Sequence, residues 1–307
     1  MPEDSGLPGR SAIVPARSVH VPVLLRETLH ALELAPGLTV VDGTVGAAGH
    51  SREILSRIGP ESTLIGLDRD AMMLQIATRH LSGPHVHLLQ ASYAELPRVL
   101  SDLQIPAVDR ILLDIGYSSD QLADESRGFS FDADGPLDLR FDVRQGEPAA
   151  DLVARLSEQE LADIIYRYGE DSDSRHIARN IVQSRARKPI RTGLDLAEAV
   201  SGASHRSSLR GEKHPATRVF QALRIVVNRE LEQLETALHG TLHGCLAPGG
   251  ILAIISFHSL EDRLIKHAFR ESTLWQSLSP KPVAPSPAEV RLNPRARSAK
   301  LRVARRI

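Results

Sequence analysis

The chain has 307 residues, 42% of them hydrophobic and 24% charged, with a formal net charge of −1 at pH 7, which is ordinary for a globular protein of one large or two small domains. A single cysteine, Cys245, excludes an internal disulfide and a cysteine-rich zinc site. No apolar run approaches the roughly 18 residues of a membrane span, so we expect a cytoplasmic protein without membrane contact. Residues 1–18 are rich in Pro, Gly and Ser and are predicted to form a disordered tail.

The near-zero net charge hides an uneven distribution along the chain. Residues 109–142 carry nine acids and three Lys/Arg, residues 175–230 carry twelve Lys/Arg and four acids, and residues 291–307 carry seven Lys/Arg and no acid. Basic segments of this kind favour a polyanionic partner. A solvated surface is the alternative explanation for any single segment.

The N-terminal part of the chain has the pattern helix, strand, glycine turn, helix. A helix is predicted over residues 26–34, and the stretch LTVVDGTVGAAGHS, residues 38–51, follows it. Its apolar run ends at Asp42, three glycines come next, and helical periodicity begins at His50. Such a turn can hold a polar or anionic ligand on its free N–H groups. Its GxxGxxG spacing differs from the GxGxxG of dinucleotide sites, and an ordinary tight turn is the alternative.

Asp68 ends the next apolar run, residues 63–68. An acid at the end of the second strand of a βαβ unit is placed to accept hydrogen bonds from the two hydroxyls of a ribose. Its separation from the glycine turn is close to what that geometry needs. Together the two features predict a site for an adenosine-containing cofactor, with a helix N-cap as the alternative role for Asp68.

Further strands are predicted over residues 86–89, 108–115 and 251–257, alternating with helices. This alternation predicts an α/β fold with a doubly wound, mostly parallel sheet, and ligands of such sheets bind outside the carboxyl ends of the strands. Asp42, Asp68, Tyr93 and Asp114 all fall at that edge, which predicts a shared cleft. Tyr93 is interpreted as a residue that flanks an adenine ring, or else as a rim aromatic.

The middle of the chain contains a segment without periodicity and then a helical segment. Residues 116–140 show neither helical nor strand periodicity and are expected to form a functional loop. Its acids match only part of a calcium loop, so no metal is predicted. Residues 146–211 are then predicted to be an all-helical insertion, with a capping box at Ser157–Glu160 and a helix over 173–187.

A long helix is predicted to begin at His214 and to continue to Leu238. Its apolar residues recur at about every 3.5 positions and are expected to lie in the core: Phe220, Leu223, Val227, Leu231, Leu234 and Leu238. Four polar residues lie off that stripe and are candidate substrate contacts: Arg218, Gln221, Arg224 and Asn228.

The last part of the chain returns to the sheet. His258 follows the strand over 251–257 and is expected near Asp114, either as a structural residue or as a proton acceptor. Residues 298–305 are interpreted as a final, antiparallel strand, and its exposed faces also explain the basic residues there.

Eight blocks of this sequence match a known family. They are His20-x-Pro-Val-Leu-Leu25, Asp42-Gly-Thr-Val-Gly-x-x-Gly-His50, Asp114-x-Gly-x-Ser-Ser119-x-Gln-Leu122, Arg127-Gly-Phe-Ser-Phe131, Asp134-Gly-Pro-Leu-Asp138, His214-Pro-Ala-Thr-Arg218-x-Phe-Gln-Ala-Leu-Arg224, Ile255-Ser-Phe-His-Ser-Leu-Glu-Asp-Arg263 and Asn293-Pro-Arg-Ala-Arg-Ser298. On these blocks the chain closely resembles the bacterial ribosomal RNA small-subunit methyltransferase H family over residues 19–306.

The resemblance implies an rRNA (cytosine-N4-)-methyltransferase that uses S-adenosylmethionine. Its implied target is N4 of cytidine 1402, in the decoding centre of 16S rRNA within the small ribosomal subunit. It also implies a Rossmann-like class I methyltransferase domain, residues 19–145 and 212–307, interrupted by a helical substrate-recognition domain, residues 146–211. A homodimer is left open. The implied cofactor contacts are Ala48, Gly49, His50, Asp68, Tyr93, Asp114 and Gln121.

The sequence departs from the family pattern at four positions. Ala48 replaces a usual glycine, which restricts the backbone but is expected to leave its N–H available. Tyr93 stands where Phe is common, and Phe141 where Met is common. Tyr117 stands where a small aliphatic residue is usual, so the base pocket is expected to differ in shape.

The implied reaction suggests roles for three residues. Because the methyl group of a sulfonium is already activated, the enzyme mainly has to align donor and acceptor. We expect Asp114 or the turn at 116–119 to provide this alignment, Tyr117 to stack on the target base, and His258 to be a second candidate for proton acceptor. Candidate substrate contacts are Ser118, Ser119, Arg127, Arg175, Arg179, Lys213, His214, Arg218 and Arg224.

Two other functions are compatible with the sequence. A nicotinamide-dependent oxidoreductase could share the fold, although the glycine spacing and the lack of a clear hydride-transfer constellation disfavour it. A non-catalytic RNA-binding assembly factor would retain the fold without turnover, which the intact Asp68, Asp114 and Gln121 disfavour.

Overall fold

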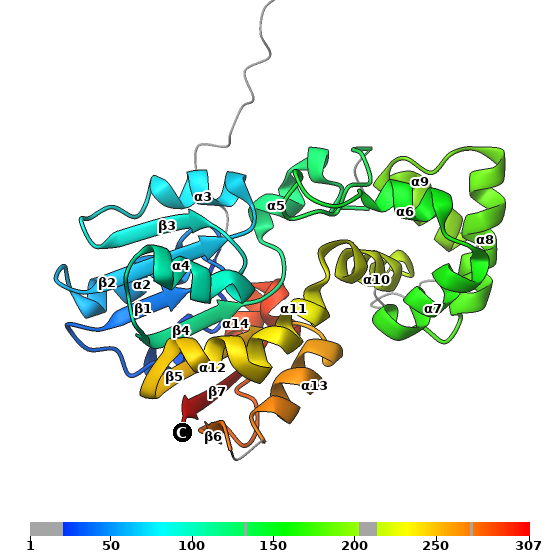
Figure 1. The fold of residues 1–307 in the computed structure, drawn as a ribbon. Helices are drawn as coiled ribbons and strands as arrows, with labels where there is room; N and C mark the ends of the chain where they lie inside the picture. The colour runs from blue at the N-terminus through cyan, green and yellow to red at the C-terminus, as the bar shows by residue number, and fades with distance from the viewer. Residues whose placement is uncertain (1–20, 132–133, 203–213, 271–272) are drawn as a thin grey trace, which may run out of the picture.

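In the described part of the chain, seven strands form one mixed sheet in the order β3-β2-β1-β4-β5-β7-β6. The computed structural model describes residues 21–131, 134–202, 214–270 and 273–307 (Figure 1). β1 to β5 are parallel, and β7 runs antiparallel to both β5 and β6. The strands are β1 (Thr39–Asp42), β2 (Thr63–Asp68), β3 (Val86–Gln90), β4 (Val108–Asp114), β5 (Leu246–Ser256), β6 (Trp275–Ser277) and β7 (Lys300–Arg306). The predicted doubly wound, Rossmann-like sheet and its final antiparallel strand are confirmed.

Helices cover both faces of this sheet, because successive strand residues point to opposite sides. In β4, Ile111 and Leu113 belong to one buried apolar cluster and Leu112 belongs to the other. The first face is covered by α4 (Leu96–Asp102), α11 (Glu230–Thr236), η3 (Ala237–Thr241), α12 (Leu242–Cys245) and α13 (Ser259–Ala268). The second is covered by α1 (Leu25–Ala31), α2 (Gly49–Ile58) and α3 (Ala71–Thr78). None of the described helices has the length and apolar character needed to cross a bilayer.

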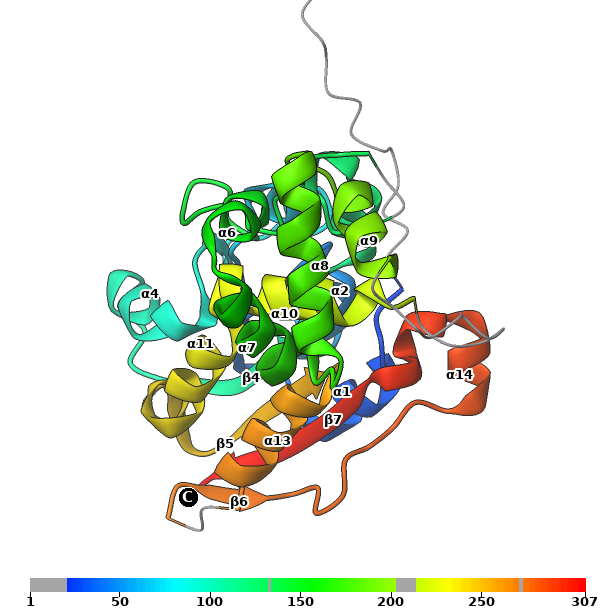
Figure 2. The ribbon, with the colours of Figure 1, turned by 90° about the vertical axis from the view of Figure 1, so that its right-hand side faces the viewer.

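A helical lobe lies beside the sheet, beyond the carboxyl ends of its strands (Figures 1 and 2). It contains α6 (Ala149–Arg155), α7 (Glu158–Gly169), α8 (Ser174–Arg187), α9 (Gly193–Ser201) and α10 (Ala216–Asn228). Capping boxes at Ser157 and Thr192 start α7 and α9, as the sequence pattern indicates for α7. The apolar core of the lobe also includes Phe129, Leu137 and Leu139. The loop before the insertion therefore packs into the helical lobe.

The predicted long helix from His214 to Leu238 is wrong, because the chain breaks between α10 and α11. Arg229 adopts a left-handed conformation with φ +52°. Just before it, buried Asn228 donates from Nδ2 to the Leu139 carbonyl (2.7 Å) and accepts at Oδ1 from the Phe141 N–H (2.8 Å). These long-range hydrogen bonds end α10, and α11 then packs on the sheet. Val227 and Leu231, expected in the core, are only partly buried on either side of the break.

Short elements complete the connections around the sheet edge. They are η1 (Tyr93–Glu95), α5 (Ser119–Ala123), η2 (Glu125–Arg127), α14 (Pro287–Leu292) and η4 (Pro294–Ser298). The segment containing α14 and η4 returns to the N-terminal region, where Glu289 Oε1 accepts from the Leu24 N–H (2.7 Å) and Asn293 Nδ2 donates to the Val21 carbonyl (3.1 Å). The predicted tail, residues 1–18, lies outside the described residues.

Candidate active site

The glycine turn after β1 is tightly packed against its neighbours. The Gly43 N–H donates to the Leu112 carbonyl at the end of β4 (2.9 Å). A Cβ at Gly43 would lie 2.4 Å from Cδ2 of Leu113, and one at Gly49 would lie 2.4 Å from Cγ of Pro22. A side chain at either position would therefore force Leu113 or Pro22 to move.

Asp42, at the end of β1, holds the turn in place. Its Oδ2 accepts from the Ser51 hydroxyl (2.6 Å) and its Oδ1 accepts from the Thr44 N–H (3.3 Å). Burial raises the pKa of Asp42 to about 6, although both hydrogen bonds act to lower it. Its side chain supports the neighbouring cleft without lining it.

Asp68, at the end of β2, lies directly opposite the glycine turn. Its Oδ2 accepts from the Gly46 N–H (3.0 Å) and its Oδ1 accepts from the Asp70 N–H (2.9 Å). Burial raises the pKa of Asp68 to about 7, and the nearby carboxylate of Asp70 adds to this effect. Each oxygen of a carboxylate can accept a further hydrogen bond. Asp68 is thus placed to receive a pair of hydroxyl groups.

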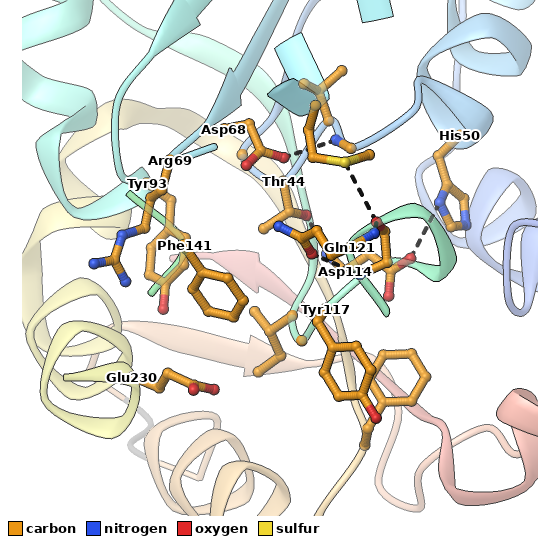
Figure 3. A pocket seen from close by; sticks show the side chains of 18 of the residues that line it. Thr44, His50, Asp68, Arg69, Tyr93, Asp114, Tyr117, Gln121, Phe141 and Glu230 are labelled. Atoms are coloured by element: carbon orange, nitrogen blue, oxygen red, sulfur yellow. Dashed lines mark hydrogen bonds and ion pairs between the residues drawn. The ribbon is translucent and has the colours of Figure 1, made fainter. Parts of the chain in front are cut away.

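A single pocket extends from this turn across the carboxyl ends of β2 and β4 (Figure 3). One part is lined by the glycine turn, Asp68 and Tyr93, and another by Asp114, Tyr117 and Phe141. Glu230 of α11 and Glu261 of α13 complete the lining. The sheet edge therefore holds the cleft that the strand ends predict.

Asp114 lines this pocket, and the protein satisfies its carboxylate only in part. Its Oδ2 lies 3.6 Å from Nδ1 of His50, and His50 Nε2 lies 3.0 Å from the Val23 carbonyl. Its Oδ1 is buried without a hydrogen-bond partner among the described residues. Burial, together with the nearby carboxylates of Asp42 and Glu261, raises the pKa of Asp114 to about 8. Because a buried, unpaired polar atom is costly, this oxygen indicates a site for a ligand group.

Three aromatic rings continue from the pocket toward the helical lobe. The rings of Tyr117 and Phe129 are stacked, with centroids 5.7 Å apart, and Phe129 is stacked on Phe141 at the same distance. Tyr117 is 40% exposed, so part of its ring is open to solvent. The Arg69 guanidinium lies 5.7 Å from the Phe141 ring centroid. An aromatic surface thus joins the pocket to the lobe core.

Ser118 and Gln121 form the capping box of α5. Ser118 Oγ accepts from the Gln121 N–H (3.1 Å), and Gln121 Oε1 accepts from the Ser118 N–H (2.8 Å). Gln121 Nε2 donates to Oδ2 of Asp70 (2.9 Å). Ser118 and Gln121 both line the pocket, whereas Ser119 does not line it and its hydroxyl accepts a hydrogen bond from Arg295.

The expectation that the Ala48 N–H stays available is wrong. Ala48 adopts φ +68°, and its N–H donates to the Val45 carbonyl (2.8 Å) inside the turn. The residue is completely buried, and the pocket is lined instead by Gly49 and His50. The left-handed conformation that a glycine usually supplies here is therefore kept by an alanine.

His258 caps α13 and does not belong to the pocket lining. Its Nδ1 accepts from the Glu261 N–H (3.4 Å), and its Nε2 lies 3.0 Å from Glu261 Oε1. The ligand atoms of Glu230, His258 and Glu261 lie within 4.8 Å of one another. Both oxygens of Glu230, however, accept from Arg224 (2.9 and 3.0 Å). The geometry favours a capping role for His258 over that of a proton acceptor.

Several candidate substrate cations lie on the helical lobe. Arg175 is exposed on α8, Arg179 pairs with Glu158 (3.5 Å), and Arg218 pairs with Asp171 (3.6 Å). His214 stacks on Phe131 with ring centroids 4.8 Å apart, and its Nδ1 accepts from the Ala216 N–H (3.2 Å). Lys213 lies outside the described residues.

Two of the candidate cations are buried, which the sequence pattern does not indicate. Arg127 Nη1 donates to Asp70 Oδ2 (2.7 Å), and Arg127 Nη2 donates to the carbonyls of Arg140 and Phe141. Arg224 is only 8% exposed and pairs with Glu230 through two hydrogen bonds. Their charges are neutralised inside the protein, so neither presents a free cation to RNA.

Sequence reasoning missed Arg69, Glu230, Phe257 and Glu261 as residues that line the pocket. Glu230 and Glu261 occupy the first turns of α11 and α13, where acids are common for reasons unrelated to function. No local signal separates such residues from ordinary helix caps, because the tertiary fold brings them to the pocket.

Comparison with known proteins agrees with this geometry. A model of the MraW methylase family matches residues 17–307. A relative from Sorangium cellulosum, "Ribosomal RNA small subunit methyltransferase H", is 50% identical over 295 residues, which cover 95% of this chain and 92% of the relative. A relative of the same name from Deinococcus radiodurans is 49% identical over 287 residues, 94% of this chain and 89% of the relative. The chain therefore belongs to the MraW methylase family, whose methyl donor is S-adenosylmethionine.

Proposed function

We propose that this protein methylates N4 of a cytidine, cytidine 1402, in the decoding centre of 16S rRNA within the small ribosomal subunit. The observation that carries the proposal is one pocket that the glycine turn and Asp68, the carboxylate of Asp114 and the ring of Tyr117 line together. The names of the relatives support small-subunit rRNA as the substrate. Family membership also argues against a nicotinamide-dependent oxidoreductase.

The residues at the sheet edge suit S-adenosylmethionine. Asp68 has acceptor capacity for the two ribose hydroxyls, and the ring of Tyr93 lies where it can flank adenine. Gly49 and His50 begin α2, whose N-terminal N–H groups favour a polar or anionic group. Gln121 lines the same pocket, but its amide is already engaged with Ser118 and Asp70. The bound cofactor supplies a methyl group already activated by its sulfonium.

Asp114 is proposed to act on the amine of the target base. The N4 lone pair of cytosine is delocalised into the ring, so positive charge develops on nitrogen as it bonds to the methyl group. In its ionised form, the Asp114 carboxylate, which lines the pocket and has one oxygen without a hydrogen-bond partner among the described residues, can accept one N4–H hydrogen bond and then take that proton. His50 Nδ1, 3.6 Å from Oδ2 of Asp114, is placed to share the proton, because its Nε2 already faces the Val23 carbonyl.

Tyr117 is proposed to stack on the flipped-out cytosine. Its exposed ring borders the pocket, and π-stacking on an aromatic side chain is a common way to hold an extruded base. Ser118 sits at the same turn and is a candidate contact to the base or its sugar. We propose residues 19–145 and 212–307 as the catalytic domain and residues 146–211 as the substrate-recognition domain, with α10, Phe129, Leu137 and Leu139 adding to the core of the helical lobe. Arg175, Arg179, Arg218 and His214 are the candidate RNA contacts of the helical lobe.

The decisive experiment is transfer of a tritiated methyl group to small subunits that lack the modification, followed by mapping of the labelled nucleotide. The expected result is label on N4 of one decoding-centre cytidine. Fully modified subunits and an Asp114→Asn variant are the controls, and both should remain unlabelled or nearly so. If the purified protein bound subunits without transferring label, a non-catalytic assembly role would replace the proposal.

A further inference from the structure

The C-terminal segment brings a second arginine to Tyr117. Arg295, in η4, donates from Nη1 to Ser119 Oγ (2.7 Å), and its guanidinium carbon lies 5.7 Å from the Tyr117 ring centroid. Arg295 and Tyr117 are 178 positions apart in the sequence, and only the fold places them side by side. Arg295 itself is partly exposed. It therefore stands beside the pocket with part of its surface accessible.

The two arginines around Tyr117 differ in how their charges are balanced. Arg224 lies 5.0 Å from the ring centroid, and Glu230 neutralises it through two hydrogen bonds. Arg295 contacts a neutral hydroxyl and an aromatic ring, and no carboxylate pairs with it within the described part of the chain. Because the Arg224 guanidinium is already ion-paired with Glu230, Arg295 is the better cation for an anionic ligand that binds beside Tyr117.

The backbone on either side of Arg295 is anchored to the rest of the fold. Next to it, Ala296 is completely buried, and the Ala296 N–H donates to the Asn293 carbonyl (3.0 Å). The Asn293 side chain in turn donates to the Val21 carbonyl (3.1 Å). A cation whose backbone is already fixed loses less conformational entropy on binding than one on a free tail. The fixed backbone therefore suits Arg295 to hold an anionic ligand in a defined place, rather than to attract it only through its charge.

We propose that Arg295 binds a phosphate of the RNA strand next to the target nucleotide and so positions that nucleotide over Tyr117. A guanidinium can stack on a tyrosine ring and still offer its N–H groups to phosphate oxygens. Arg295 does not line the cofactor pocket, which favours RNA over the cofactor carboxylate as its ligand. The proposal rests on the proposed function and adds a named substrate contact to it.

The test compares Arg295→Ala and Arg295→Lys with Arg297→Ala, a matched control two residues further along and exposed. Unmodified small subunits are titrated with each variant over a range of salt concentrations, and S-adenosylmethionine binding is measured separately by calorimetry. Arg295→Ala should weaken subunit binding by about tenfold and reduce the salt slope by about one. Arg295→Lys should recover part of both, and Arg297→Ala should match the wild type. Cofactor affinity should stay within about twofold of wild type in all variants, as expected for an RNA contact.

Three results would overturn the proposal. Unchanged subunit affinity and salt slope for Arg295→Ala would remove the phosphate contact. An equal loss for Arg297→Ala would show general charge attraction, and a loss confined to cofactor binding would place Arg295 at the cofactor carboxylate. Thermal unfolding of each variant identifies a folding defect, and if Arg295→Ala unfolds, Arg295→Gln, which can keep the bond to Ser119, takes its place. Failure of the proposed function is seen separately, as wild-type protein that binds subunits but transfers no methyl group.

Discussion

The carboxylates of Asp42, Asp68 and Asp114, at the sheet edge, differ in how many hydrogen bonds they accept from the protein. Asp42 accepts from Ser51 and Thr44, and Asp68 accepts from two backbone N–H groups, whereas one oxygen of Asp114 has no partner among the described residues. Their pKa values rise in the same order, to about 6, about 7 and about 8, with burial as the largest cause in each. The least satisfied carboxylate is thus the one that the proposed chemistry uses.

The raised pKa of Asp114 predicts a pH-dependent stability of the cofactor-free protein. A carboxyl whose pKa rises on folding stabilises the folded state below its unfolded pKa, and this contribution is lost as the pH rises through the folded pKa. For Asp114 the window runs from the ordinary aspartate pKa of 3.8 to about 8. The melting temperature should therefore fall between pH 6 and pH 9, as measured by circular dichroism.

Asp114→Asn should flatten the upper part of that decline, because an amide does not ionise. Asp102→Asn, which changes a carboxylate with 61% side-chain exposure, is the control and should follow the wild-type curve. A wild-type melting temperature that rises across this range, or an Asp114→Asn curve parallel to wild type, would contradict the assigned environment of Asp114.

Stacking on Tyr117 predicts a large kinetic effect of its removal. A base stacked on an aromatic side chain contributes about 1–3 kcal/mol, so Tyr117→Ala should lower kcat/KM for subunit methylation by about 5- to 150-fold. Tyr117→Phe should retain most activity. Tyr166→Ala, which removes a tyrosine that is 64% exposed on α7, is the control. Unchanged methylation kinetics for Tyr117→Ala would rule out the stacking role.

At the scale of elements, the loop between β4 and α6 owes its shape to buried contacts. Arg127 pairs with Asp70 at 2.7 Å, with only 9% and 4% of the two side chains exposed. Removing one partner of such a pair leaves an uncompensated buried charge and typically costs about 3–5 kcal/mol. Apart from the short α5 and η2, side-chain and carbonyl contacts rather than a backbone ladder determine the course of the described part of this segment.

Gly128 provides a direct test of that packing. It adopts φ +70°, and a Cβ there would lie 2.2 Å from the Pro136 carbonyl oxygen. Gly146 has the same φ, and a Cβ there would have nothing within 4 Å. Gly146→Ala should therefore cost only the backbone strain, about 1–2 kcal/mol. Gly128→Ala should cost about 1–3 kcal/mol more because of the clash.

The measurement is the free energy of unfolding from denaturant titration of both variants. Equal losses for Gly128→Ala and Gly146→Ala would mean that the loop relaxes freely around residue 128. A larger loss of unfolding free energy for Gly128→Ala, together with weaker S-adenosylmethionine binding, would confirm that this loop supports the pocket beside Tyr117 and Phe141.

At the scale of the whole molecule, Glu170 joins the helical lobe to the sheet domain. It follows α7, and its carboxylate accepts from Ser259 Oγ and from Arg263 Nη2 (3.0 Å), both on α13. The hydrogen bond from Ser259 and the charge of Arg263 help to hold the pKa of Glu170 below its usual value. The side chain is 38% exposed, so solvent screens the pair and its contribution to global stability is small.

Glu170→Ala should therefore change the free energy of unfolding by less than about 1 kcal/mol and still loosen the contact between the two parts. Hydrogen exchange should increase at the end of α7 and the start of α13, with little change elsewhere. Glu158→Ala, which removes a pair within the lobe, is the control and should leave α13 unaffected. Unchanged exchange at α13 in Glu170→Ala would show that other contacts hold the lobe.

Local patterns of the sequence were sufficient to predict the alternating strands and helices, the glycine turn, the acids at the strand ends and the capping box at Ser157. These features depend on residues within one or two turns of each other, where propensity and capping act directly. The blocks that resemble the methyltransferase family also indicated the cofactor and target, and family membership is confirmed.

Only the tertiary structure decided which arginines are free and where the long helix breaks. Arg127 and Arg224 are buried because Asp70 and Glu230 meet them, and α10 ends because Asn228 bonds to a loop about 87 residues earlier in the chain. Arg295 reaches Tyr117 by the same kind of long-range contact. Such pairings depend on how distant elements pack, and helical or strand periodicity holds no information about them.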